Sequence, residues 1–377
     1  MAFSFKIYTS AKELPEDWEQ IVGQHNTLLS RPYFSVLEDA KPENMQCYFA
    51  AFFSGEELIG GALFQYLSFT RHQTFQKDEL LCDVKNFLAK QFSRDVMFVG
   101  NNMLTGQNAF HFNEKKIKMS QVSSLLNLAV EELQKNYRKT SLIIYKDFRK
   151  KFADLFECEE HKKYLRFSVQ PNMMLSIKKD WKTFENYLSD FSTKYRSRAT
   201  TARKKSKNIT KKELQLLDIK KLQKEINFLY QNVADNAPFN TFFLPENHFY
   251  RLKESMQDNF RIFGYFLDEK LIGFYTVILN NKDVDTYFLG YDKDLQKEKQ
   301  IYLNMLLDMV EFSIENRFSR IIFGRTALEI KSTIGAEPAE IFGLIKHNNI
   351  IINPFMERIF PSLSPKTEWI QRKPFKV

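Results

Sequence analysis

The chain has 377 residues, which exceeds the usual size of one domain and favours two cores of roughly 150 to 200 residues each. Its 44% hydrophobic and 27% charged residues are typical of a globular protein and exclude a chain that is disordered throughout. The net charge of +9 is concentrated between Lys194 and Lys212, where nine basic residues occur without an acidic one.

The first half of the chain predicts a strand, a turn and a strand over Tyr48 to Phe69, where the polar sequence SGEE separates two apolar runs. The apolar segment RDVMFVGN then indicates a third strand. A long amphipathic helix is expected from Met119 to Lys135, and TSLIIYKDF indicates a strand after it. A boundary between halves is expected within Cys158 to Pro171, which gives domains of residues 1–165 and 166–377.

The second half opens with the apolar strand MMLSI. Helices are expected over Trp181 to Asp190, over much of the basic segment, and over Lys220 to Ala234, whereas APFNTFFLPEN indicates a loop. The segment Phe260 to Leu279 then repeats the early hairpin. Its DEKLIGF aligns with GEELIGG at an offset of 213 residues, from Gly55 to Asp268.

The surroundings of the two hairpins also correspond. The second hairpin is followed by VDTYFLGYD, a helix around Ile301 to Asn316 and the strand SRIIFGRT. Each half therefore runs strand, strand, strand, helix, strand, which predicts an α/β fold with a mixed sheet whose final crossover makes a parallel pair. We expect the two related halves to pack together, because no long flexible linker separates them.

Several kinds of site have no support in the sequence. Neither a P-loop nor the dinucleotide fingerprint occurs, no nucleophile elbow is present, and the six His residues form no pair at metal-binding spacing. No metal is therefore expected. Neither a secretory signal nor an apolar run of roughly 20 residues is present. Cys47, Cys82 and Cys158 are odd in number and widely spaced, which suits free thiols, so we expect a cytoplasmic protein.

The basic segment is the first candidate binding site. Arg196, Arg203 and Lys207 follow one another at spacings of seven and four residues, as one helical face requires. Such a face can bind phosphate or carboxylate oxygens, and Arg gives bidentate contacts. The alternative is a solvated helix surface. Neither interpretation outweighs the other, since cations without acidic neighbours repel each other and usually need an anionic partner.

The second candidate is FGRTALEIKSTIGAEP, which directly follows the last strand of the second half. Ligands bind at the carboxyl ends of strands in open α/β sheets. Arg325 and Lys331 offer two donors there and Glu329 offers a base, or two of them form a structural ion pair. Tyr287 and Tyr291, in VDTYFLGYD, can donate a hydrogen bond or proton, or else serve in packing.

The order YLSDFSTKYRSRATTARKKSKNI, DEKLIGFYTVIL, TYFLGYD and IIFGRTALEIKSTIGA resembles the FemAB-like branch of the GNAT superfamily. That branch includes the Fem aminoacyl transferases of peptidoglycan cross-bridge synthesis. The first half matches it mainly in layout, including LLSRPYFSVLE. The resemblance implies two tandem GNAT-like domains and transfer of an acyl or aminoacyl group, from acyl-CoA or aminoacyl-tRNA, to a small-molecule or peptide amine.

By position, the resemblance places Lys331 near the reacting carbonyl and Arg196 in the family's basic helix. We expect Lys331 and Arg325 to stabilise charge, Tyr287 or Glu329 to transfer a proton, and the basic segment to bind donor or acceptor phosphates. The Gly-rich pyrophosphate loop of ordinary GNAT enzymes is missing after TYFLGYD. The long helical hairpin typical of Fem enzymes is absent too, so the donor stays open between acyl-CoA and aminoacyl-tRNA.

The first half lacks counterparts of Arg325 and Lys331, because its last strand runs into YKDFRKKF. We therefore expect a degenerate domain that walls the site or binds the acceptor. The alternative from another class is a non-catalytic protein that binds nucleic acid or phosphate through residues 194–212. Only Tyr195 interrupts that run as an aromatic residue, so base stacking is not encoded there.

Overall fold

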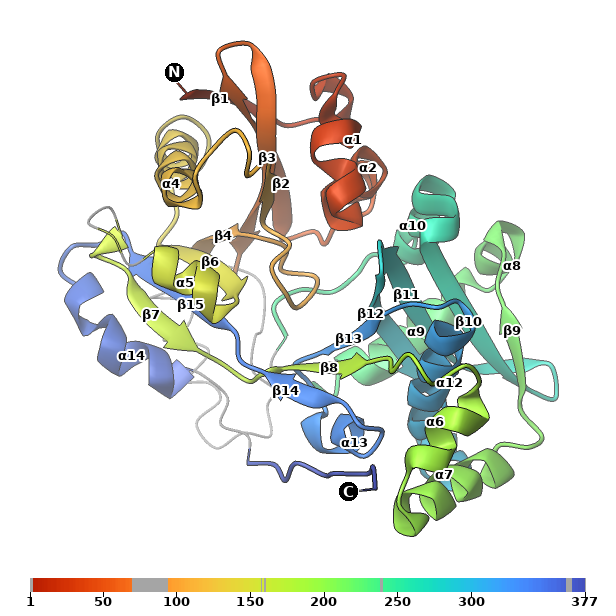
Figure 1. Ribbon diagram of the computed structural model, residues 1–377. Coiled ribbons are helices and arrows are strands. Elements are labelled where there is room, and N and C mark those ends of the chain that lie inside the picture. Colours follow the sequence, from red (N-terminus) through yellow and green to blue (C-terminus); the bar gives the residue numbers. More distant parts are fainter. Residues whose placement is uncertain are drawn as a thin grey trace. The chain divides into compact units, whose positions relative to one another are not determined.

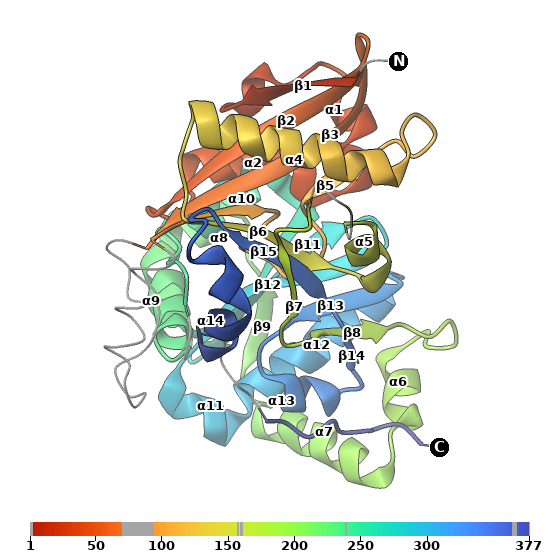
Figure 2. The ribbon, with the colours of Figure 1, turned by 90° about the vertical axis from the view of Figure 1, so that its left-hand side faces the viewer.

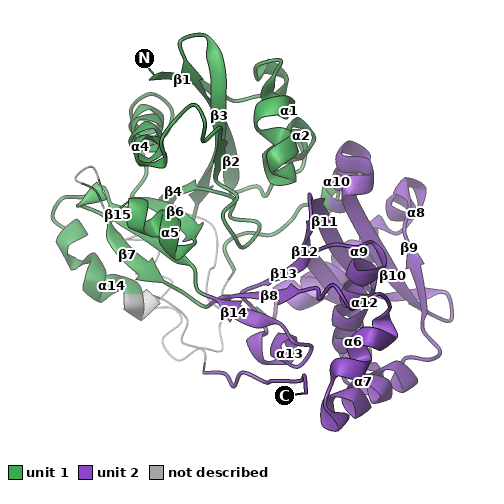
Figure 3. Cartoon of the chain, viewed as in Figure 1, with its two compact units in different colours: residues 1–170, 237–248, 340–366 green, residues 171–236, 249–339, 367–377 purple. Residues whose placement is uncertain are grey.

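The computed structural model describes residues 3–69, 94–156, 158, 161–237, 240–363 and 368–376. Cys82 lies outside them. The chain forms two compact units, shown in Figure 3. The first comprises residues 1–170, 237–248 and 340–366, and the second comprises 171–236, 249–339 and 367–377. The main change of unit thus falls five residues after the predicted boundary at 165, and two later segments return to the first unit.

The first unit contains an eight-stranded mixed sheet in the order β1-β2-β3-β4-β6-β15-β7, with β5 paired to β3. Among the described residues of this unit, only β4 and β6 are parallel, and the other strand pairs are antiparallel. The strands are β1 (Phe3–Tyr8), β2 (Met45–Ser54), β3 (Glu57–Ser68), β4 (Asp95–Val99), β5 (Phe110–Phe112), β6 (Leu142–Phe148), β7 (Leu165–Ser168) and β15 (Phe342–His347).

Helices cover this sheet because each carries an apolar face. The long helix α4 (Met119–Asn136) crosses strands β1 to β3 and joins the core of β2, β3, β4 and β6 (Figure 2). Its apolar residues recur at helical spacing, which is the pattern that predicted it. The other α-helices in the described part of this unit are α1 (Trp18–Ile21), α2 (Arg31–Asp39), α5 (Lys150–Leu155) and α14 (Met356–Leu363).

The second unit contains a seven-stranded sheet in the order β14-β8-β13-β12-β11-β10-β9 (Figure 1). Here β12 and β13 form the parallel pair. The strands are β8 (Asn172–Ser176), β9 (Thr210–Glu213), β10 (Phe260–Leu267), β11 (Lys270–Asn280), β12 (Asp283–Tyr291), β13 (Arg320–Gly324) and β14 (Glu337–Ala339). The connecting helices are α6 (Phe184–Asp190), α7 (Thr193–Lys205), α8 (Leu216–Lys221), α9 (Gln223–Ala234), α10 (His248–Met256), α11 (Lys293–Lys299), α12 (Ile301–Glu315) and α13 (Leu328–Ser332).

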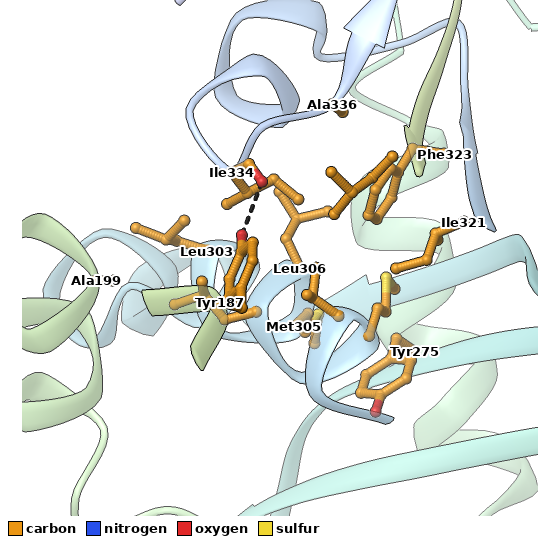
Figure 4. Close-up of a cluster of buried hydrophobic side chains, with 14 of the residues drawn as sticks. Tyr187, Ala199, Tyr275, Leu303, Met305, Leu306, Ile321, Phe323, Ile334 and Ala336 are labelled. Carbon is orange, nitrogen blue, oxygen red and sulfur yellow. Dashed lines mark hydrogen bonds between the residues drawn. The ribbon is translucent and has the colours of Figure 1, made fainter. Parts of the chain in front are cut away.

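The helix α12 is the centre of the second core. Eleven of its 15 residues are buried, so the helix is packed on nearly all sides. Figure 4 shows part of this core, in which Leu303 of α12 lies beside Tyr187 of α6 and Leu306 lies between Tyr187 and Phe323 of β13. The Tyr187 hydroxyl donates to the Ile334 carbonyl at 2.7 Å, which ties α6 to the segment after α13.

The predicted order of elements is confirmed in both units. In the first it is β2, β3, β4, α4 and β6, and in the second it is β10, β11, β12, α12 and β13, with the short elements β5 and α11 in addition. The final crossover makes a parallel pair in each, so the mixed α/β class is also confirmed. Sequence reasoning did not anticipate β15, which follows the second core yet pairs with β6 and β7 of the first sheet.

Candidate active site

The parallel strands β12 and β13 separate after a short pairing. They pair only from Asp283 with Arg320 to Asp285 with Ile322, although β12 continues to Tyr291. Beyond that point β11 is the only sheet partner of β12 within the described residues, and the pairing contains a bulge at which the Thr276 hydroxyl donates to the Phe288 carbonyl at 2.6 Å. The facing edges of β12 and β13 therefore part at their carboxyl ends, which is where ligands bind in open α/β sheets.

Lys331 lies at this separation. Its Nζ donates to the carbonyl of Phe323 at 2.5 Å, and Phe323 directly follows Ile322, the last β13 residue paired with β12. The turn from β13 into α13 uses two residues with left-handed backbone, Gly324 (φ 78°) and Ala327 (φ 52°), and this turn brings α13 back over the strand. The Lys331 side chain is consequently buried, with 3% of its surface exposed.

The buried ammonium of Lys331 has little compensation. Within the described residues it forms no ion pair, and the Phe323 carbonyl is the only acceptor for its three protons. Burial accordingly lowers the pKa of Lys331 to about 7. A buried cation with unused donors, held where two strands part, can bind an anionic group on a ligand.

The other residues predicted from this segment and from β12 have different surroundings. Glu329 is half-exposed and forms an ion pair with Arg372 at 2.5 Å. Tyr287, partly buried on β12, packs edge-on against its neighbour Phe288. Tyr291 contacts the ring of Tyr302, and burial raises its pKa. Arg325 is partly buried in the turn between β13 and α13.

The basic segment does not present one cationic face. Arg196 donates to the carbonyls of Leu188 at 3.1 Å and Ser189 at 2.7 Å, so its guanidinium caps the end of α6. Arg203 donates to a carboxylate of α12 instead. Lys207 is exposed beyond the end of α7. The predicted set of three is thus divided between an intramolecular cap, an intramolecular ion pair and a cation that faces solvent.

The carboxylate that meets Arg203 belongs to Asp308, which is buried on α12. Its Oδ1 accepts from Arg203 at 2.7 Å and from Lys211 at 3.1 Å, and its Oδ2 accepts from the Tyr265 hydroxyl. Sequence reasoning missed this cluster. The signal was present, because Asp308 and Glu311 lie three residues apart and can meet one basic neighbour from a single helical face.

Asp285 is a second buried acid that the sequence did not reveal. It is the last β12 residue paired with β13, and 2% of its surface is exposed. Its Oδ2 accepts from the Asn280 amide at 3.3 Å. Burial, the largest cause, raises the pKa of Asp285 to about 7. Asp285 and Lys331 are thus a buried acid and a buried base whose pKa values both lie near neutrality.

These two groups predict a characteristic pH dependence of stability. Asp285 keeps its proton in the folded state up to about pH 7 but loses it near pH 4 when unfolded, so its contribution falls from pH 4 to 7. Lys331 loses its proton near pH 7 only when folded, so its contribution rises from pH 7 to about 10. Asp285→Asn should remove this falling contribution, worth up to about 4 kcal/mol, and the difference in unfolding free energy between variant and wild type from pH 4 to 10 measures it. A variant that keeps the wild-type slope below pH 7 would contradict this assignment.

In the first unit, the parallel strand pair also ends at a buried lysine, but the ammonium of this lysine is hydrogen-bonded within the protein. Its parallel strands pair from Val96 to Val99 of β4, and the last partner on β6 is Tyr145. The next residue, Lys146, donates from its buried Nζ to the carbonyls of Asn101 and Leu104, both at 2.8 Å, and to the Asp147 carboxylate at 2.5 Å. This ammonium is neutralised and has three acceptors, unlike that of Lys331. At the end of the parallel strand pair, Lys331 of the second unit therefore has donors left for a ligand, whereas Lys146 of the first unit has none.

Neither a scan of protein-family models nor a search of curated proteins finds a match to this chain. Solved structures do match it. FemX has a TM-score of 0.55 at 11% identity, over 95% of this chain and 100% of FemX. L-PGS from Bacillus licheniformis has a TM-score of 0.50 at 10% identity, over 87% and 94% of the two chains. A tandem GNAT protein from the clavulanic acid biosynthesis pathway reaches 0.46 at 10% identity, over 92% and 98%.

The protein therefore has a fold similar to that of FemX, which agrees with the fold that the resemblance of the sequence motifs implied. Among the solved structures of that fold, it is similar to FemX over nearly its entire length. Within the described residues, no helix has the length and apolar character needed to cross a membrane.

Proposed function

We propose that the protein transfers an acyl or aminoacyl group from a phosphate-bearing donor to an amine. The observation that carries the proposal is the uncompensated ammonium of Lys331 at the separation of β12 and β13. In such a transfer the amine nitrogen bonds to the acyl carbon, the C–S or C–O bond to the donor breaks, and the amine gives up a proton. Negative charge develops on the acyl oxygen, and a preorganised buried cation stabilises it.

The separation between β12 and β13 would hold the acyl group, with its oxygen toward Lys331. Arg325, in the adjoining turn, adds a second cation to the same end of the sheet. Tyr287 or Glu329 would transfer the proton that the amine gives up. We favour Tyr287, because it lies on the β12 edge of the separation, whereas Glu329 would first have to release Arg372.

The phosphates of the donor would lie near the end of α7. The Ser206 hydroxyl donates to the Lys299 carbonyl at 2.5 Å, so the end of α7 lies against the start of α12. The next residue, Lys207, is exposed, as are Lys205 and Arg198. A helix N-terminus beside free cations favours phosphate. Arg196 and Arg203 support this surface from within, since their guanidinium groups are already hydrogen-bonded.

Ligand-induced thermal stabilisation tests the proposal. The protein is heated with acyl-CoA, with aminoacyl-tRNA and with uncharged tRNA, and we expect one activated donor to raise the melting temperature in a saturable manner. Lys205→Gln/Lys207→Gln should weaken that effect about tenfold or more, given roughly 1.5 to 3 kcal/mol for a charge-assisted contact. The exposed pair Lys220→Gln/Lys224→Gln removes the same charge elsewhere and should bind like the wild type.

Two outcomes would contradict transfer. The first is stabilisation by none of the donors. The second is equal binding of charged and uncharged tRNA that weakens steeply with salt, which would favour the non-catalytic nucleic-acid-binding alternative. That alternative has a smaller surface than the sequence indicated, because Arg196, Arg203, Lys211 and Lys212 are bonded to groups of the protein itself.

A further inference from the structure

The loop between β15 and α14 belongs to the first unit (Figure 1). It presents large apolar side chains to solvent. Ile350, Ile351 and Phe355 expose 81%, 74% and 52% of their surfaces. Single exposed apolar residues are ordinary on protein surfaces, but three within six positions form a local apolar projection. We call residues 350–355 the apolar tip.

The apolar tip is held in this conformation by hydrogen bonds. The Asn349 side chain accepts from the Ile351 amide at 2.8 Å, and the Asn353 side chain accepts from the His347 amide at 2.8 Å. The Asn353 amide also donates to the Lys163 carbonyl at 2.8 Å. The polar side chains of the loop therefore turn inward to the backbone while the isoleucines point outward. This is the reverse of an ordinary surface loop, whose polar residues face water.

A cationic pocket of about 410 Å³ adjoins the apolar tip. Asn348, the first residue after β15, belongs to its wall and donates to the Thr140 carbonyl at 2.8 Å. The charged residues that line the pocket are Lys135, Lys139, Lys346 and Glu131. Three cations against one carboxylate leave an excess of positive charge, and no ion pair joins any of the four within the described residues.

Lys346 packs against an aromatic side chain of the pocket. Its Nζ lies 5.3 Å from the ring centroid of Tyr164, which also lines the pocket. Burial and the nearby Lys163 lower the pKa of Lys346, whereas Glu131 opposes that change. An anionic ligand would be attracted by Lys135, Lys139 and Lys346 together. The amides of Asn127, Gln134 and Asn348 add neutral hydrogen-bonding groups to the same walls.

We propose that this surface docks the first unit on a bilayer that contains anionic phospholipid. The apolar tip enters the interface between headgroups and acyl chains, and the cationic pocket binds a headgroup phosphate beside it. Apolar residues flanked by lysines are the combination that binds anionic membranes peripherally. A protein partner would require a broader complementary patch than three side chains provide. The proposal involves neither Lys331 nor the second unit, so it stands apart from the transfer reaction.

Co-sedimentation with vesicles tests the docking surface. The full chain is mixed with vesicles of phosphatidylcholine alone and of phosphatidylcholine with phosphatidylglycerol, and we expect it to sediment with the anionic vesicles. Ile350→Ser/Ile351→Ser should abolish binding to the anionic vesicles. Lys135→Gln/Lys139→Gln should lower the affinity for anionic vesicles about 30-fold, since each lysine near such a surface contributes roughly fivefold.

Matched variants elsewhere separate docking from general surface chemistry. Leu217, which is 72% exposed in the second unit, offers Leu217→Ser as the apolar control, and Lys220→Gln/Lys224→Gln is the charge control. Both should bind vesicles like the wild type. Failure of the wild type to sediment with anionic vesicles would overturn the proposal, and so would unchanged binding by Ile350→Ser/Ile351→Ser. Stabilisation by glycerol 3-phosphate without vesicle binding would assign the pocket to a soluble anion instead.

Discussion

Lys331→Met is expected to make the protein more stable at pH 6 while it abolishes transfer. The fall in the pKa of Lys331 from 10.5 to about 7 corresponds to about 5 kcal/mol that opposes folding when the side chain is charged. Methionine fills a similar volume without that charge but loses the hydrogen bond to Phe323, so we expect a net gain of about 2 to 4 kcal/mol. The melting temperature should rise by several degrees at pH 6, and the gain should shrink by pH 9, where the wild-type amine is neutral when folded.

Lys146→Met provides the matched comparison in the first unit. Lys146 is equally buried, but removing it leaves the Asp147 carboxylate buried with its cation lost, so we expect destabilisation of about 3 to 5 kcal/mol. Thermal unfolding of both variants from pH 6 to 9, together with turnover of the identified donor, measures both predictions. A destabilised but active Lys331→Met variant would assign Lys331 to structure alone. Greater stability with lost turnover is the signature of a residue kept for function.

The architecture could be predicted from the sequence because it depends on local patterns. The echo of GEELIGG in DEKLIGF identified two hairpins, and apolar periodicity located the helices α4 and α12 after them. The strand β15 could not be placed in the same way. Its short apolar run, FGLIKH, pairs with β6 almost 200 residues earlier in the chain, and apolar alternation carries no information about which edge a strand will join.

The candidate site was only partly predictable, for a related reason. Helical spacing predicts that Arg196, Arg203 and Lys207 share one face, but it identifies neither the end of α7 before Lys207 nor the group that each side chain meets. Arg196 meets the end of α6, whereas Arg203 meets α12. The position of Lys331 after a strand indicated its location, but its lack of a partner became visible only with the fold. Asp285 escaped notice because burial of an acid in a strand cannot be read from its neighbours.

The difference between Lys331 and Lys146 explains how a fold built from two related units can carry a candidate site in only one of them. Each unit buries a lysine near the end of its parallel pair, and the difference lies in the acceptors supplied. Three acceptors, one of them a carboxylate, satisfy Lys146, whereas one carbonyl receives Lys331. A buried polar group without partners is unfavourable for folding and persists when a ligand supplies the missing interaction. The asymmetry in hydrogen bonding thus favours the second unit as the place of chemistry.

Asp308→Ala is expected to be the most destabilising single change in the second unit. Asp308 is buried and receives hydrogen bonds from Arg203, Lys211 and Tyr265. Its removal leaves the buried Tyr265 hydroxyl without its acceptor and takes the buried carboxylate from Arg203 and Lys211, which among the described residues keep only the half-buried Glu311 as an acidic partner. Loss of one partner from a buried ionic cluster lowers the unfolding free energy by about 3 to 5 kcal/mol.

Urea unfolding of the full chain measures this loss, and Glu311→Ala is the control. Glu311 contacts the same guanidinium of Arg203 at 3.1 Å, but 29% of its side chain is exposed. Exposed ion pairs contribute about 1 kcal/mol or less, so we expect the two variants to differ by at least about 2 kcal/mol. Equal losses would mean that the α7 cations are held by their common attraction to α12 rather than by the buried carboxylate. The larger loss in Asp308→Ala would instead assign Arg203 and Lys211 to the scaffold, which leaves Lys207 and its exposed neighbours as the cations available to a ligand.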